Sequence, residues 1–148
     1  MRLRAMVFVL VAFLGVPMLA SGEQNAGKNQ VFVWGGACDL FDEMSTAIYG
    51  ASYGRYLTRW LMLEAGVEGY SGDVSGTWSR INALFEIPTG SRLAAYAIAG
   101  TSSFYPDLGA GAKIRFASRV GIRLEYTRAY DDDEGWYGNI RGGVTLSF

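Results

Sequence analysis

Apolar and polar residues alternate with a period of two in four separate stretches of the chain. The stretch 119–127 illustrates the pattern, since one of its faces carries Val120, Ile122, Leu124 and Tyr126. The stretches 61–69, 77–87 and 108–116 alternate in the same way. Because successive side chains of a strand point to opposite sides, each stretch predicts a β-strand with one apolar and one polar face.

Turn-like segments between the apolar runs predict eight strands in all. We place them at 30–38, 45–56, 59–70, 77–87, 91–101, 108–116, 119–129 and 137–148. The second, fourth and sixth connections are tight and the other four are longer, which predicts an all-β, antiparallel up-and-down barrel. The first, second and fifth strands alternate less clearly, so their faces are not assigned.

The first 22 residues have the pattern of a secretory signal peptide. Arg2 and Arg4 precede an apolar run over 5–15, and small residues follow it. A membrane-anchoring helix is the alternative, but the run is shorter than the roughly 20 residues that a span needs. We therefore expect a signal peptide over 1–22, cleaved after Ala20 or Gly22, and a barrel domain over 23–148.

The polar faces of the strands carry nearly balanced charge. They hold Glu64, Glu68, Arg80, Glu86, Lys113, Arg115, Arg123, Glu125 and Arg141. Arginine dominates among the cations, and its fork geometry suits confined pairing with carboxylates. Glycines on the same faces would leave room for long side chains, at positions 66, 109, 111, 121 and 143. We expect these nine charged residues to form an ion-pair network inside the barrel.

The remaining charges differ in sign between the two ends of the predicted barrel, and aromatic residues gather near both ends. The longer connections hold only acidic charges, namely Asp39, Asp42, Glu43, Asp73, Asp107, Asp131, Asp132, Asp133 and Glu134. The tight turns or their edges hold Arg55, Arg59, Arg92 and Arg119. Aromatics lie toward the loop end (Tyr70, Trp78, Tyr130, Trp136, Tyr137) and toward the turn end (Tyr56, Trp60, Phe85, Phe116, Phe148). Two aromatic girdles around an apolar band are typical of a transmembrane barrel.

Alternation alone leaves open which face is inside. A soluble lipocalin-like barrel keeps its apolar face within and binds an apolar ligand there, whereas a membrane barrel turns that face to lipid. The balanced charged face, the sorted rims and the aromatic girdles favour the membrane barrel. The soluble periplasmic barrel remains the alternative.

Two segments near the carboxyl end carry a family resemblance. The segments 81–100 ("INALFEIPTGSRLAAYAIAG") and 108–148 ("LGAGAKIRF…TLSF") resemble the small OmpA-like, opacity-type outer-membrane β-barrels of Gram-negative bacteria. The resemblance implies an eight-stranded barrel in the bacterial outer membrane, with periplasmic turns and extracellular loops. It also implies that Val144, Leu146 and Phe148 form the signal read by the outer-membrane assembly machinery. The loops are short for that family.

Composition narrows the functions further. The chain of 148 residues contains no histidine and one cysteine, and its formal net charge is −1. Small barrels that resemble lipid A deacylases or palmitoyltransferases rely on histidine with serine, so that mechanism is not available. We expect no enzymatic activity, no cofactor and no nucleic-acid partner, and we expect a monomer.

The sequence thus predicts a structural or surface protein of the outer membrane, in contact with outer-membrane lipid and lipopolysaccharide. An eight-stranded barrel is just wide enough for its own side chains to fill, so a small porin-like channel is the less favoured alternative. The run Asp131, Asp132, Asp133 and Glu134 is interpreted as a solvated acidic loop rather than a cation site, because it lacks the spaced ligands of a dedicated calcium loop.

Overall fold

The computed structural model describes residues 28–39, 45–71, 76–89, 92–103, 105–131 and 135–148. The predicted signal peptide over 1–22 lies outside these residues, as do Asp132, Asp133 and Glu134 of the predicted acidic loop. In the described part of the chain, no helix has the length and apolar character needed to cross a membrane.

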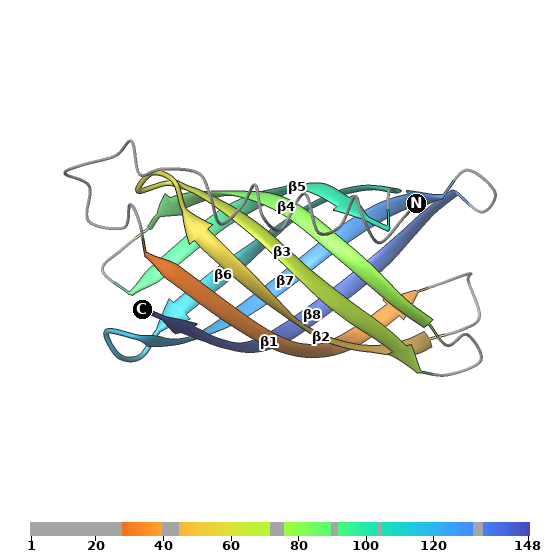
Figure 1. Cartoon of the computed structure of the whole chain (residues 1–148), viewed down its shortest axis with the longest axis horizontal. Helices are drawn as coiled ribbons and strands as arrows, with labels where there is room; N and C mark the ends of the chain where they lie inside the picture. Colours follow the sequence, from red (N-terminus) through yellow and green to blue (C-terminus); the bar gives the residue numbers. More distant parts are fainter. Residues whose placement is uncertain (1–27, 40–44, 72–75, 90–91, 104, 132–134) are drawn as a thin grey trace, which may run out of the picture.

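Eight antiparallel strands form one closed barrel, in chain order (Figure 1). They are β1 (Asn29–Asp39), β2 (Ser45–Tyr56), β3 (Leu61–Ser71), β4 (Gly76–Pro88), β5 (Leu93–Ser102), β6 (Tyr105–Arg115), β7 (Val120–Asp131) and β8 (Gly135–Ser147). Each strand is hydrogen-bonded to its neighbours in the chain, and β8 returns to pair with β1. The predicted eight-stranded up-and-down barrel is confirmed.

The two ends of the barrel sequence meet at the β1–β8 seam. The Asn29 N–H donates to the Phe148 carbonyl at 2.8 Å, and the Phe148 N–H donates to the Asn29 carbonyl at 3.0 Å. Ten further register pairs, from Gln30–Ser147 to Asp39–Gly138, continue the seam to the loop end. The last residue of the chain is therefore held by the first strand, which leaves no open sheet edge.

The fifth connection differs from the sequence prediction. The segment around Tyr105 and Asp107 was expected to be a loop, but β5 and β6 pair up to Ser102 and Tyr105 and are joined by two residues. Ser103 in this turn has a φ of 48°, the left-handed conformation that tight hairpin turns use. As a result Asp107 lies inside β6 rather than on the loop rim.

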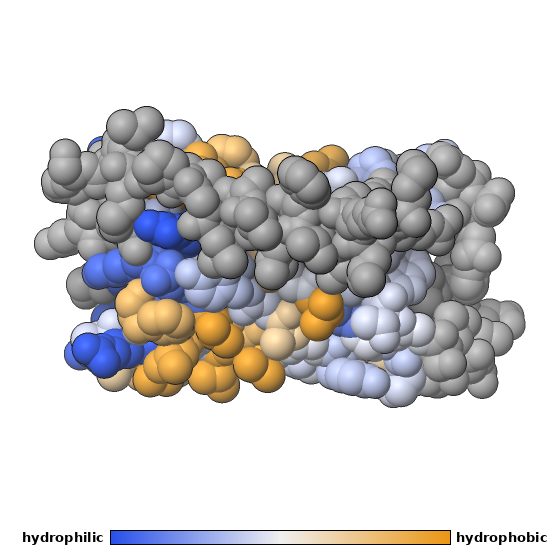
Figure 2. All heavy atoms as spheres, in the orientation of Figure 1, coloured by the Kyte–Doolittle hydropathy of each residue, from blue (hydrophilic) through white to orange (hydrophobic). Residues whose placement is uncertain are grey.

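The inside of the barrel holds the buried charged and polar side chains together with aromatic and a few aliphatic ones, and apolar side chains cover the outside. Along β7 every second residue is buried, and the residues between are exposed. The exposed large apolar side chains include Ile122, Leu124 and Val144, of which 46%, 57% and 55% of the surface is accessible. On the face shown in Figure 2, strongly hydrophilic residues gather at the left-hand end, the turn end in Figure 1, and hydrophobic residues lie between the ends.

The aromatic girdles are smaller than predicted. Tyr56, Tyr70 and Tyr137 are buried inside the barrel, and Trp78 packs against the internal cluster that contains Tyr70 and Tyr137. Each of the four lies an even number of residues from an inward residue of its own strand, as Tyr70 does from Glu68 on β3, and therefore points to the same side. Of the aromatics predicted for the girdles, those that point outward are Tyr130 and Trp136 toward the loops, and Trp60, Phe85, Phe116 and Phe148 toward the turns.

Candidate functional site: the charged interior

Arg123 is the centre of the buried polar network. It projects inward from β7, and its Nη1 lies 2.5 Å from Glu64 Oε2, while its Nη2 donates to Glu64 Oε1 at 3.1 Å. Its Nε donates to Glu125 Oε1 at 2.6 Å. Glu64 lies on β3, four strands away in a ring of eight. The bidentate pair therefore connects opposite walls of the barrel.

A second bidentate pair lies nearer the loop end. Arg141 on β8 donates from Nε to Glu68 Oε2 at 3.0 Å and from Nη2 to Glu68 Oε1 at 3.2 Å. The third donor, Nη1, reaches Thr127 Oγ1 at 2.7 Å. Tyr70 and Ser102 donate to the same carboxylate at 2.9 and 3.1 Å. A buried carboxylate is stabilised by this number of donors.

Arg80 on β4 extends the network from Glu125 toward Asp107. Its Nη2 lies 3.4 Å from Glu125 Oε2, and its Nε lies 3.9 Å from Asp107 Oδ2. Asp107 has no accessible surface, although the sequence analysis placed it in a loop. The guanidinium of Arg80 also lies 5.2 Å from the centre of the Trp34 ring, within the range of a cation–π contact.

A separate triad occupies the turn end of the lumen. Lys113 Nζ on β6 lies 2.6 Å from Glu86 Oε2 on β4 and 2.5 Å from the Tyr56 hydroxyl on β2. The Tyr56 hydroxyl in turn donates to Glu86 Oε2 at 2.5 Å. Because β2 and β6 are four strands apart, this triad also crosses the full width of the barrel.

Aromatic side chains fill the space around the charges. The Arg123 guanidinium carbon lies 4.2 Å from the centre of the Phe32 ring, and its Nε donates to the Tyr96 hydroxyl at 3.0 Å. Tyr96 lies over Gly111, where any Cβ would collide with the phenol. Glycine at this position makes the close approach of Tyr96 possible.

An aromatic cluster lies at the loop end of the lumen. The Trp78 ring centre lies 5.0 Å from that of Tyr70, 6.3 Å from that of Tyr137 and 6.1 Å from that of Tyr105. The buried side chains of Cys38 and other residues pack in the same cluster. Going from the turns to the loops, the inside of the barrel therefore holds a triad, a charged network and an aromatic layer.

The structure places the sequence-predicted residues as follows. Glu64, Glu68, Arg80, Glu86, Lys113, Arg123, Glu125 and Arg141 are all buried and joined by the contacts described above. Arg115 shares their face but is half-buried at the turn end of β6. Val144, Leu146 and Phe148 point outward along the seam, with about half of each side chain exposed. Asp131 is the last residue of β7.

Sequence reasoning missed several residues that belong to the network. Asp107 was missed because Pro106 and the serines before it are typical of a turn. Tyr56 and Tyr70 were assigned to girdles. Tyr70 lies on the same face of β3 as Glu68, which indicated an inward direction, whereas β2 carries no charged residue on the face of Tyr56. The inward direction of Phe32 and Trp34 could not be predicted from their neighbours in the sequence, because their charged partners come from other strands of the barrel.

The interior consists of closely packed side chains. Among the described residues, no group of three acidic, cysteine or histidine side chains is placed to hold a metal ion. The faces are also the reverse of those that an apolar-ligand barrel needs, since the lumen is lined with ion pairs and the outside is apolar.

Comparison with known proteins gives the fold but no family assignment from sequence. No family model matches the chain, and no curated protein matches it. Among solved structures, the N-terminal β-barrel domain of Pseudomonas aeruginosa OprF aligns with a TM-score of 0.71 and 20% identity, over 84% of this chain and all of that domain.

Two other outer-surface barrels align over similar lengths. Neisserial surface protein A has a TM-score of 0.66 at 14% identity, covering 82% of this chain and 99% of that protein. Ail, the attachment invasion locus protein of Yersinia pestis, has a TM-score of 0.62 at 11% identity, covering 83% and 99%. The chain has the fold of the small eight-stranded outer-membrane barrels.

Proposed function

We propose that the protein is an outer-membrane β-barrel with a structural or surface role, without catalysis and without an open pore. The observation that carries the proposal is the Arg123–Glu64 pair, which connects opposite walls of a lumen filled by side chains. The apolar outward face supports a place in lipid, where every backbone polar group must be paired within the barrel.

The closed lumen argues against the alternative of a small porin-like channel. The Lys113–Glu86–Tyr56 triad crosses the turn end, and the Trp78 cluster lies inside the loop end. Barrels with water-filled channels have about 16 or more strands. An ion would have to break buried ion pairs at two levels in order to pass.

Location in the membrane is tested by fractionation and gel mobility. We expect the protein in urea-washed outer membranes, and we expect its band to move when the sample is boiled, because a closed barrel resists cold detergent. Recovery in the soluble periplasmic fraction, with no change of mobility on boiling, would contradict the proposal. The same assay with Phe148→Ala tests our further proposal that Val144, Leu146 and Phe148 are read by the assembly machinery, for which we expect less membrane-inserted protein.

The closed state is tested by conductance in planar lipid bilayers. We expect no single-channel steps from the heat-modifiable wild-type protein. Arg123→Ala removes the connection to Glu64 and is the variant in which leakage should first appear. Regular conductance steps from the wild-type protein would favour the channel instead.

A further inference from the structure

One cationic side chain stands out on the outward face of the barrel. Arg128 projects outward from β7 near the loop end and is exposed. At the described strand positions, the only other lysine or arginine on this face is Arg55, at the turn end of β2. A charge on the lipid-facing side of a barrel is unfavourable unless it reaches a polar partner.

Two aromatic side chains with polar groups lie near Arg128 at the edge of the apolar band. Its guanidinium carbon lies 5.8 Å from the centre of the Trp136 ring. Its register partner on β8 is Gly138, which has no side chain to cover it. The Tyr126 hydroxyl also lies over Gly138, since a Cβ built there would be 3.1 Å from it. A guanidinium, a phenol and an indole thus face one small area.

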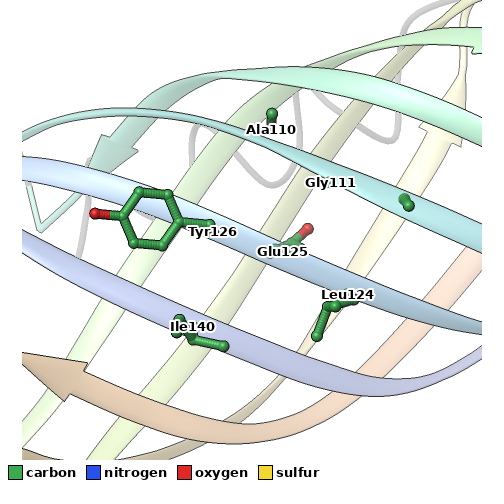
Figure 3. A pocket seen from close by; sticks show the side chains of 7 residues that line it. Ala110, Gly111, Leu124, Glu125, Tyr126 and Ile140 are labelled. Carbon is green, nitrogen blue, oxygen red and sulfur yellow. The ribbon is translucent and has the colours of Figure 1, made fainter.

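An apolar groove continues from this area along the barrel wall. The part of the groove nearer the loops is lined by Arg128 together with Leu108, Ala110, Tyr126 and Trp136. The part nearer the turns is lined by Ala110, Ala112, Leu124, Tyr126 and Ile140. The two parts therefore meet at Ala110 and Tyr126. Figure 3 shows Tyr126, Leu124 and Ile140 on β7 and β8 beside Ala110 and Gly111 of β6.

The small side chains of β6 make the groove. Ala110 and Ala112 alternate with Gly109 and Gly111, so little projects from this strand between Leu108 and Ile114. From Arg128 to Leu124 the strand advances by four residues, about 13 Å. This length suits an extended acyl chain whose headgroup lies at Arg128.

We infer that Arg128 and this groove bind one phosphorylated lipid of the outer leaflet. The phosphate would accept hydrogen bonds from the Arg128 guanidinium and the Tyr126 hydroxyl, and one acyl chain would lie over Ala110 and Ala112. Charge complementarity selects the occupant, because no ion pair joins Arg128 to a carboxylate among the described residues, and a phosphate would supply the counter-ion that a neutral headgroup lacks. The inference rests on the proposed function, which places the loop end in the outer leaflet, where phosphorylated glycolipids of the lipopolysaccharide class are found.

The test uses native mass spectrometry of the protein folded in a neutral detergent and titrated with diphosphoryl lipid A. Before titration, each variant is checked for the mobility shift on boiling, so that failure to form a barrel is separated from failure to bind. We expect one retained lipid per wild-type barrel. Arg128→Ala should weaken retention at least tenfold, and Arg128→Lys should weaken it less. Arg55→Ala is the matched control and should bind like the wild type.

The groove is tested independently of the charge. Ala110→Phe keeps Arg128 but fills the groove, so we expect retention to fall by a similar factor. Equal retention by wild type and Arg128→Ala would overturn the inference, as would retention of a neutral glycolipid with the same acyl chains to the same extent. Dimers that form through this face and exclude the lipid would overturn it as well.

Discussion

Arg123 and Glu64 form a two-point contact between opposite walls of the barrel, with N–O distances of 2.5 and 3.1 Å. Neither side chain is reached by solvent to more than a few per cent. Removing charges from water costs several kcal/mol each, and that cost is offset here by paired geometry and by further donors. The pair thus holds the two walls at a fixed distance and fills the space between them.

Loss of Arg123 should destabilise the barrel strongly. In Arg123→Leu, both Glu64 and Glu125 lose their closest cation, and we expect the free energy of unfolding to fall by about 3–5 kcal/mol. Urea unfolding in lipid vesicles, followed by tryptophan fluorescence, measures this change. Glu64→Gln should cost less, because Arg123 keeps its contact with Glu125. A loss below about 1 kcal/mol for Arg123→Leu would show that the network is solvated, as surface pairs are.

Lys113 and Arg115 lie two residues apart on the same face of β6 and should behave differently. Lys113→Met removes a buried partner of Glu86, and we expect a loss of about 3 kcal/mol. Arg115 is half-buried at the turn end, so Arg115→Met should cost less than about 1 kcal/mol. The same urea titration compares the two variants. Equal losses would mean that depth in the lumen does not set the strength of these pairs.

Gly111→Ala tests the contact between Tyr96 and the wall of β6. A methyl group at this position would displace the phenol that accepts from Arg123, and we expect a loss of about 1–3 kcal/mol. Gly142→Ala is a matched control, because the nearest atom to its Cβ would be Leu124 Cδ1 at 3.5 Å. We expect that variant to unfold at the urea concentration of the wild type or slightly above. A neutral Gly111→Ala would show that Tyr96 can move without loss.

The fold could be predicted from the sequence where a strand has one clear apolar side. Strands β3, β4, β6 and β7 show the alternation, and the structure has the predicted faces there. Strand β1 does not, because Phe32 and Trp34 are inward while Gly35 and Ala37 are outward. These aromatics are inside because they contact arginines from distant strands, which a local pattern does not reveal.

The charged interior could be predicted as a set of residues but not as a set of pairs. Alternation put Arg123 and Glu64 on polar faces, and the balanced charge and the aromatic girdles indicated that these faces are inside. Their partnership, however, depends on the number and tilt of the strands. Asp107 was missed because a proline inside the edge of a strand looks like a turn. The internal aromatics at the loop end were missed because their distance from the rim was weighed above their parity.

Quenching of tryptophan fluorescence by lipids with brominated acyl chains tests most directly whether the apolar face is turned to lipid. Variants that retain one tryptophan each, with phenylalanine at the other three positions, are reconstituted in such vesicles. Trp60 and Trp136 have 45% and 49% of their surface exposed on the outside, whereas Trp34 is 4% exposed inside the lumen. The account predicts strong quenching of Trp60 and Trp136 and little quenching of Trp34. Strong quenching of Trp34, with Trp60 and Trp136 unaffected, would contradict it.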